Sequence, residues 1–115
     1  MIKHPLALGK LKNNSGAVLY TVDTSQTIVL NTIRLKNLDP EGSVTIYTPI
    51  ISIFSRGAAI ELTPSVSSLR PGFTLELIHQ DSKILLEQGS LILGYCNPSD
   101  KVSYLIDGKE LNVLE

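Results

Sequence analysis

The sequence has little of what catalysis, metal binding and secretion depend on. Among its 115 residues there are one cysteine, two histidines and no tryptophan. Cys96 cannot form a disulfide within the chain, so nothing in the sequence requires an oxidising compartment. No apolar run approaches the roughly 20 residues that cross a bilayer, and no signal-peptide pattern opens the sequence. We therefore expect a soluble, unsecreted protein that does not bind membranes.

Motifs that carry chemistry are also missing. His4 and His79 are the only histidines, and the serines near His79 lack the nucleophile-elbow motif that would favour a hydrolase triad. Cys96, His79 and Asp100 have none of the paired spacings of zinc sites. Cys96, at the end of a predicted strand, is interpreted as a small buried hydrophobe. We expect no enzymatic activity, no cofactor and no metal.

The net charge of −1 hides an uneven distribution. Residues 1–36 contain five basic residues and one aspartate, whereas residues 37–115 contain five basic and ten acidic residues. One interpretation is that the two parts face each other in one fold. The other is a basic N-terminal arm that lies on an acidic neighbouring subunit. No dense cluster of lysine and arginine alternates with aromatic residues, so we do not expect nucleic-acid binding.

Short alternating runs, separated by turn residues, fill most of the sequence. Residues 18–22 and 27–35 favour β-structure, and the polar segment between them predicts two strands joined by a short turn. The second run changes its side-chain parity near Asn31, which predicts a bulge. Similar runs predict further strands. They are residues 5–12, 44–48, 50–54, 58–63, 73–77, 83–87, 90–96, 102–106 and 109–114.

Two turn signals predict hairpins near the C-terminus. The cluster Asn-Pro-Ser-Asp at 97–100 predicts an antiparallel hairpin of residues 91–95 with 102–106. Asp107-Gly108 is the strongest hairpin signal and predicts that residues 109–114 fold back on 103–106. About eight to ten short strands with turns at this spacing predict an all-β antiparallel sandwich, jelly-roll-like in arrangement. We assign residues 1–12 to an N-terminal arm or edge strand and residues 13–115 to a single β-sandwich domain.

Two stretches are candidates for contact with other chains. Residues 46–54 hold more apolar side chains than one buried face of a short strand pair can hide. They are expected either to meet another subunit or to form a fully buried strand between two sheets. The N-terminal arm is a candidate clasp on a neighbouring chain, because Pro5 limits its strand pairing. The candidate interface residues are Lys3, His4, Lys10, Lys12, Tyr47, Ile51, Ile53 and Phe54.

The order of several short motifs resembles a known family. These motifs are Gly-Lys-Leu at residues 9–11, Val-Leu-Tyr-Thr-Val at 18–22, Thr-Ile-Arg-Leu-Lys-Asn at 32–37 and Val-Thr-Ile at 44–46. In this order they are similar to segments of the small β-sandwich virion proteins of tailed bacteriophages, many of cyanobacterial hosts. Segments 69–72, 85–92 and 102–108 extend the similarity, which spans residues 9–111. Asp23 and Ser90 depart from the family pattern, in which proline and aspartate are usual.

The resemblance implies a non-enzymatic virion structural protein, assembled in the host cytoplasm. Its role would be that of a capsid decoration or cement protein, which bridges major capsid subunits and is itself a homo-oligomer, with a trimer favoured. A neck or tail adaptor that binds other virion proteins is the alternative within this class.

A host-surface glycan-binding module is the alternative from another class. It would need an aromatic platform built from Tyr20, Tyr47, Tyr95 or Tyr104. A tyrosine cluster around a concave face would favour the glycan module, whereas a flat apolar patch beside a basic arm would favour assembly.

Overall fold

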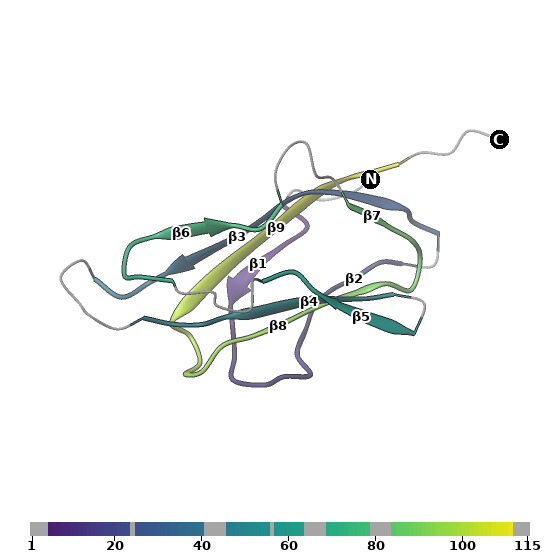
Figure 1. Cartoon of the computed structure of the whole chain (residues 1–115). Coiled ribbons are helices and arrows are strands. Elements are labelled where there is room, and N and C mark those ends of the chain that lie inside the picture. Colours follow the sequence, from purple (N-terminus) through teal and green to yellow (C-terminus); the bar gives the residue numbers. More distant parts are fainter. Residues whose placement is uncertain are drawn as a thin grey trace.

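The computed structural model consists of two antiparallel β-sheets packed face to face (Figure 1). It describes residues 5–23, 25–40, 46–55, 57–63, 69–78 and 84–111. These residues contain nine strands and no helix, which confirms the predicted all-β sandwich. The strands are β1 (Ala7–Lys10), β2 (Val18–Thr21), β3 (Ile28–Asn37), β4 (Ile50–Ser55), β5 (Ala58–Glu61), β6 (Thr74–Glu76), β7 (Ile84–Leu86), β8 (Leu91–Tyr95) and β9 (Val102–Glu110).

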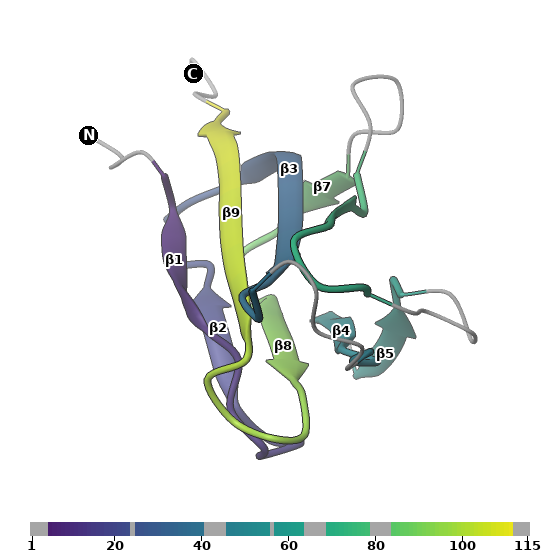
Figure 2. The same ribbon diagram turned by 90° about the vertical axis from the view of Figure 1, so that its left-hand side faces the viewer.

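The two sheets differ in their construction. Sheet A has the order β1-β9-β3-β6, and β7 also pairs with β3. Sheet B has the order β2-β8-β4-β5. The long strands β3 and β9 form the centre of sheet A, with Ile28 opposite Glu110 at one end and Asn37 opposite Val102 at the other. Figure 2 shows β9 between β1 and β3 along this centre.

The predicted hairpin of residues 91–95 with 102–106 is wrong, because the chain crosses from one sheet to the other at this turn. The two strands predicted at 18–22 and 27–35 are present, but the segment that joins them also crosses between the sheets. β2 pairs with β8 in sheet B, whereas β3 belongs to sheet A. Likewise β8 belongs to sheet B and β9 to sheet A. Crossing between layers lets each strand bury its apolar face against the opposite sheet. The segments after β2 and after β8 therefore connect layers and do not close hairpins.

The hairpin predicted at Asp107-Gly108 is also wrong, since both residues lie within β9. Gly108 is opposite Leu30, where the register between β3 and β9 shifts. The shift confirms the bulge predicted near Asn31. A Cβ atom added to Gly108 would lie 2.6 Å from the carbonyl oxygen of Val29. The glycine therefore permits a close approach of two strands and makes no turn.

Most of the other strand predictions are confirmed with small changes at their ends, whereas β9 runs well beyond the predicted residues 102–106. The exception among the described residues is the segment around Tyr47, which forms an isolated bridge with Leu69 and no strand. The first part of that prediction, residues 44 and 45, lies outside the described residues, as do residues 112–114 of the last predicted strand. The rest of that last strand, up to Glu110, continues β9.

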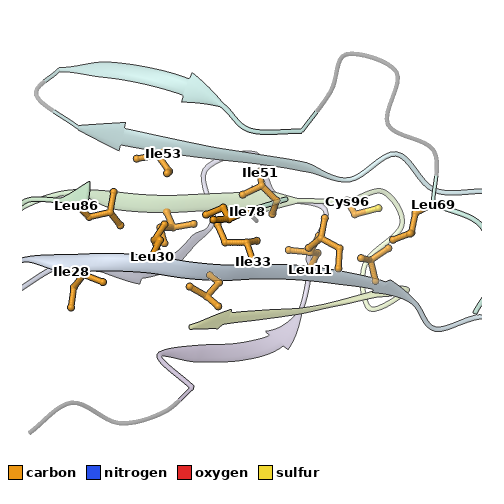
Figure 3. Packing of buried hydrophobic residues seen from close by; sticks show 14 of the residues in the cluster. Leu11, Ile28, Leu30, Ile33, Ile51, Ile53, Leu69, Ile78, Leu86 and Cys96 are labelled. Carbon is orange, nitrogen blue, oxygen red and sulfur yellow. The ribbon is translucent and has the colours of Figure 1, made fainter. Parts of the chain in front are cut away.

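The core lies between the sheets and receives side chains from both (Figure 3). In β3, side chains alternate between the two faces of sheet A, and the inward-facing Ile33 and Leu35 are fully buried. Ile51 and Ile53 of β4 enter the same layer from sheet B. Burial of these apolar side chains is the main favourable contribution to folding.

The N-terminal segment is part of this sandwich. β1 pairs with β9 at the edge of sheet A, and Leu11, directly after β1, is fully buried in the core. Of the two alternatives for residues 1–12, the edge strand therefore describes residues 7–10. Residues 1–4 lie outside the described residues.

Candidate functional site

The outer face of sheet A carries a row of hydrophilic side chains across four strands. Lys10 on β1 is opposite Ser103 on β9, and Ser103 is opposite Lys36 on β3. Thr74 on β6 is opposite Lys36 and completes the row. Because alternate residues of a strand share a face, and inward-facing Leu35 precedes Lys36, the row points away from the core. Two strand spacings separate Lys10 from Lys36, about 10 Å.

A second row lies directly beside the first. It contains Leu8 on β1, Leu105 on β9, Arg34 on β3 and Glu76 on β6, which are cross-strand partners in that order. Leu8 has 65% of its surface exposed, which is high for a leucine. The side chains of this row therefore run from apolar at the β1 edge to charged at the β6 edge.

All residues of the two rows except Glu76 line a groove of about 450 Å³ on the outer face of sheet A. Leu8, Leu105 and Leu38 supply its apolar side chains, whereas Lys10, Arg34 and Lys36 supply its cations. The guanidinium of Arg34 lies 3.5 Å from the carboxylate of Glu76. Within the described part of the chain, the ammonium groups of Lys10 and Lys36 have no carboxylate at ion-pair distance. We call this surface the basic groove; it suits an occupant that is both acidic and apolar.

The outer face of sheet B is different, because three of its strands present no charge there. Val18, Leu93 and Ser52 form one cross-strand row, and Thr21, Leu91 and Phe54 form the next. Tyr95 and Ile50 are opposite each other beyond the first row. Most of these side chains are half-buried, and Phe54 is 38% exposed. The first row continues from Ser52 to its cross-strand partner Glu61 on the edge strand β5, and Glu61 is the first charged residue on this face.

The predicted interface residues fall into different environments. Lys10 lies in the basic groove, and Phe54 lies on the outer face of sheet B. Lys12 forms an ion pair with Asp100 of the same chain, and this pair lowers the pKa of the Asp100 carboxyl. Lys3 and His4 lie outside the described residues.

Three further members of that set are buried in the core of the chain itself. Tyr47, Ile51 and Ile53 are 6%, 0% and 4% exposed. The sequence predicts that residues 46–54 either meet another subunit or form a buried strand between two sheets. The second alternative applies to these three side chains, since the opposite sheet already covers them. Their assignment to an interface is wrong, because the sequence does not show that two sheets enclose β4.

The hydroxyl of Tyr47 takes part in a polar cluster at one end of the sandwich. It donates a 2.6 Å hydrogen bond to the Asp39 carboxylate. This bond, together with burial and the charge of Asp39, raises the pKa of Tyr47 to about 12. The fully buried Asn37 donates from Nδ2 to the carbonyl oxygen of Leu69 and accepts from the backbone N–H of Asp39. Lys101 lies 3.5 Å from the same carboxylate of Asp39. These contacts are structural, since they hold together the segments that meet at this end.

Among the described residues, those considered for chemistry do not come together in a site. His4 and His79 both lie outside the described residues. Cys96 is buried in the core, and burial raises the pKa of its thiol, so the reactive thiolate is disfavoured. In the described ranges, no three side chains of His, Cys, Asp or Glu lie close enough to hold a metal ion. Those ranges also contain no helix with the length and apolar character needed to cross a membrane.

The four tyrosines do not share one outer face. Tyr47 is buried, and Tyr95 lies on the outer face of sheet B. Tyr20 is opposite the inward-facing Ile92, and Tyr104 packs against Gly9. A second groove, of about 470 Å³, has no aromatic side chain among its described lining residues. That groove is lined by Ser25, Gln26, Thr27, Leu85, Glu87 and Gln88.

Sequence reasoning missed most of the basic groove. Along the sequence, Arg34 and Lys36 are simply part of the basic N-terminal third. The alternation of Arg34 and Lys36 with buried neighbours is a signal that both face the same side of a strand. No local signal places them beside Leu8 and Lys10, since this requires that β9 lie between β1 and β3.

In comparisons with known protein families, curated protein sequences and solved structures, nothing matches this chain.

Proposed function

We propose that this chain is a non-enzymatic structural protein of a bacteriophage virion, and specifically a capsid decoration protein that docks through the basic groove. The proposed partner is an acidic and partly apolar surface on the major capsid protein. The proposal of a virion protein rests on the order of short motifs in the sequence, which resembles that of the small β-sandwich virion proteins of tailed bacteriophages. The observation that carries the docking role is the basic groove, which places Lys10 and Lys36 on the same surface as the exposed Leu8, without carboxylates at ion-pair distance in the described chain.

The groove suits docking better than catalysis for physical reasons. It is open, and its lining residues include no histidine, aspartate or glutamate that could act as a base for the hydroxyls of Ser103, Thr74 or Tyr104. Apolar side chains in the centre of an interface gain free energy when water leaves, while charges at the rim favour an oppositely charged partner. A rigid pair of sheets holds these groups in place before binding, which lowers the entropic cost of association.

A decoration protein with this groove would stabilise the shell by mass action. If the decoration protein binds assembled capsid subunits but not separated ones, its binding free energy is added to the free energy required to disassemble the shell. An interface of about 800 Å² on each partner is the usual size for stable association. The groove alone is smaller, so we expect neighbouring residues of β1 and of the Val102 end of β9 to contribute to the contact.

The test is the incorporation of groove variants into phage particles. The double variant Lys10→Glu and Lys36→Glu reverses both unpaired cations of the groove. At about 1 kcal/mol for each lost contact, it is expected to bind particles about 30-fold more weakly. The amount of the protein in purified particles, measured by quantitative mass spectrometry, reports the loss.

Lys109→Glu is the matched control, because Lys109 is an exposed lysine of the same sheet opposite Val29, outside the groove. We expect this variant to be incorporated as the wild type is. Absence of the wild-type protein from purified particles would refute the virion role. Equal incorporation of the double variant and the control would refute docking through the groove.

A further inference from the structure

The edge strand β5 has backbone groups that no described residue pairs. β5 pairs with β4 on one side, and the Leu62 N–H donates to the Ile51 carbonyl at 2.8 Å just beyond the strand. In an antiparallel pair, residues alternate between pointing their N–H and C=O toward the partner strand and away from it. The backbone N–H and C=O of Ile60 therefore point toward β4, whereas those of Ala59 and Glu61 point away from β4, toward the open edge of the sheet. Neither Ala59 nor Glu61 has a backbone partner on that side in the described chain.

β5 also lacks most features that prevent edge strands from pairing with other chains. Its four residues are all exposed, and Ile60 is 63% exposed. It contains no proline, no lysine and no register shift. The other edge of sheet B, β2, has a shift between Val18 and Tyr20. At the edge of sheet A, β1 carries Lys10.

β5 lies at the edge of sheet B, beside β4 (Figure 2). We propose that two copies of this chain pair through β5, antiparallel and about a two-fold axis, which joins their B sheets into one continuous sheet. The alternation fixes the register. Ala59 of each copy lies opposite Glu61 of the other, and each such hydrogen-bonded pair exchanges two N–H···O bonds. Ile60 lies opposite Ile60 of the second copy at the position where side chains approach most closely. The exposed isoleucine is thereby buried against its copy.

Charge favours a second copy as the occupant. In this register Glu61 faces an alanine, so the one charged residue of β5 does not meet its own copy directly. A two-fold register centred on Glu61 would place the carboxylates of the two copies opposite each other. One centred on Ala59 would require Gly57 to pair as a strand residue, but its φ of +77° is left-handed. The adjoining strands β4 and β8 present no charge on the outer face of sheet B, so the joined sheets bring no like charges together there.

This pairing is independent of the proposed virion role, and its two-fold symmetry differs from the trimer that the resemblance implies. Sedimentation of the full chain over about 1–100 µM tests it, with a micromolar dissociation constant expected for the dimer. Ile60→Lys places two like charges at the axis and is expected to raise the dissociation constant at least tenfold. The matched control is Phe73→Lys, since Phe73 is 62% exposed and lies outside sheet B; it should dimerise as the wild type does.

Two further variants exclude an effect on folding. Ala59→Pro removes an N–H that points away from β4, so it should block the dimer while circular dichroism shows an intact sandwich. Mixing Ile60→Lys with Ile60→Glu chains should restore the dimer through opposite charges. A wild type that stays monomeric at about 100 µM or forms a trimer overturns the proposal. Dimerisation of Ile60→Lys or Ala59→Pro at wild-type strength, or failure of the mixed charges to pair, also overturns it.

Discussion

Gly108→Ala is the change that most directly probes how β3 and β9 pair. Gly108 lies in the C-terminal half of β9 opposite Leu30, and its φ is not left-handed. A methyl group there would lie 2.6 Å from the carbonyl oxygen of Val29 and 3.2 Å from the Cα of Leu30. Both atoms belong to the backbone, so they cannot rotate away as a side chain would. The two central strands of sheet A must separate locally to admit the methyl group.

The expected cost follows from these contacts. Adding a methyl group to a closely packed site costs about 1–3 kcal/mol, and a clash with backbone belongs at the upper end. Replacing glycine also reduces the entropy of the unfolded chain, which offsets about 0.4–1 kcal/mol. The net loss in the free energy of unfolding is then about 2 kcal/mol. For a chain of this length it lowers Tm by about 8 °C.

Chemical denaturation and calorimetry measure this loss. Gly16→Ala is the matched control, because a Cβ atom on Gly16 would have only the Asn14 Oδ1 nearby, at 3.7 Å. We expect the control to leave stability unchanged or to raise it by a few tenths of a kcal/mol. If Gly108→Ala is as stable as Gly16→Ala, the close approach of β3 and β9 at the bulge is refuted.

Two further predictions concern groups with shifted pKa values. Because the pKa of Tyr47 is raised to about 12, the folded protein keeps the phenol proton at pH values where the unfolded chain has lost it. Stability should therefore fall as the pH rises from about 10 to 12. Tyr47→Phe should flatten this part of the Tm profile relative to the wild type, and equal slopes would contradict the role of its bond to Asp39. Burial raises the pKa of the Cys96 thiol, so a thiol reagent at about pH 8 should modify the native chain far more slowly than the denatured one. Equal rates would show that Cys96 is accessible.

Side-chain alternation explains why the strands and their faces were largely predictable. Ile33 and Leu35 alternate with Arg34 and Lys36, and the structure buries the first two and exposes the others. The change of parity near Asn31 likewise indicated the bulge. Such patterns are readable because a strand directs successive side chains to opposite faces whatever it pairs with.

Strand partners were not predictable in the same way. The Asp-Gly pair at 107–108 is a strong local turn signal, yet β9 continues through it to reach Glu110. Local β-propensities differ by about 1 kcal/mol, whereas burying one large apolar side chain contributes about 1.5–3 kcal/mol. Extending β9 along β3 brings Gly108 opposite Leu30 and keeps Ile106 in the core. Long-range packing therefore outweighs the local turn preference.

The sequence by itself determined the class of the fold, the approximate strands and the side of each strand that is apolar, because these depend on neighbours along the chain. Tertiary structure alone decided which strands share a sheet. This arrangement of strands buries Tyr47, Ile51 and Ile53. It also places Lys10 and Lys36 in one groove, on either side of β9. The physical reason is that a strand's hydrogen-bonding edges accept many partners, and only the packing of both sheets around one core selects among them.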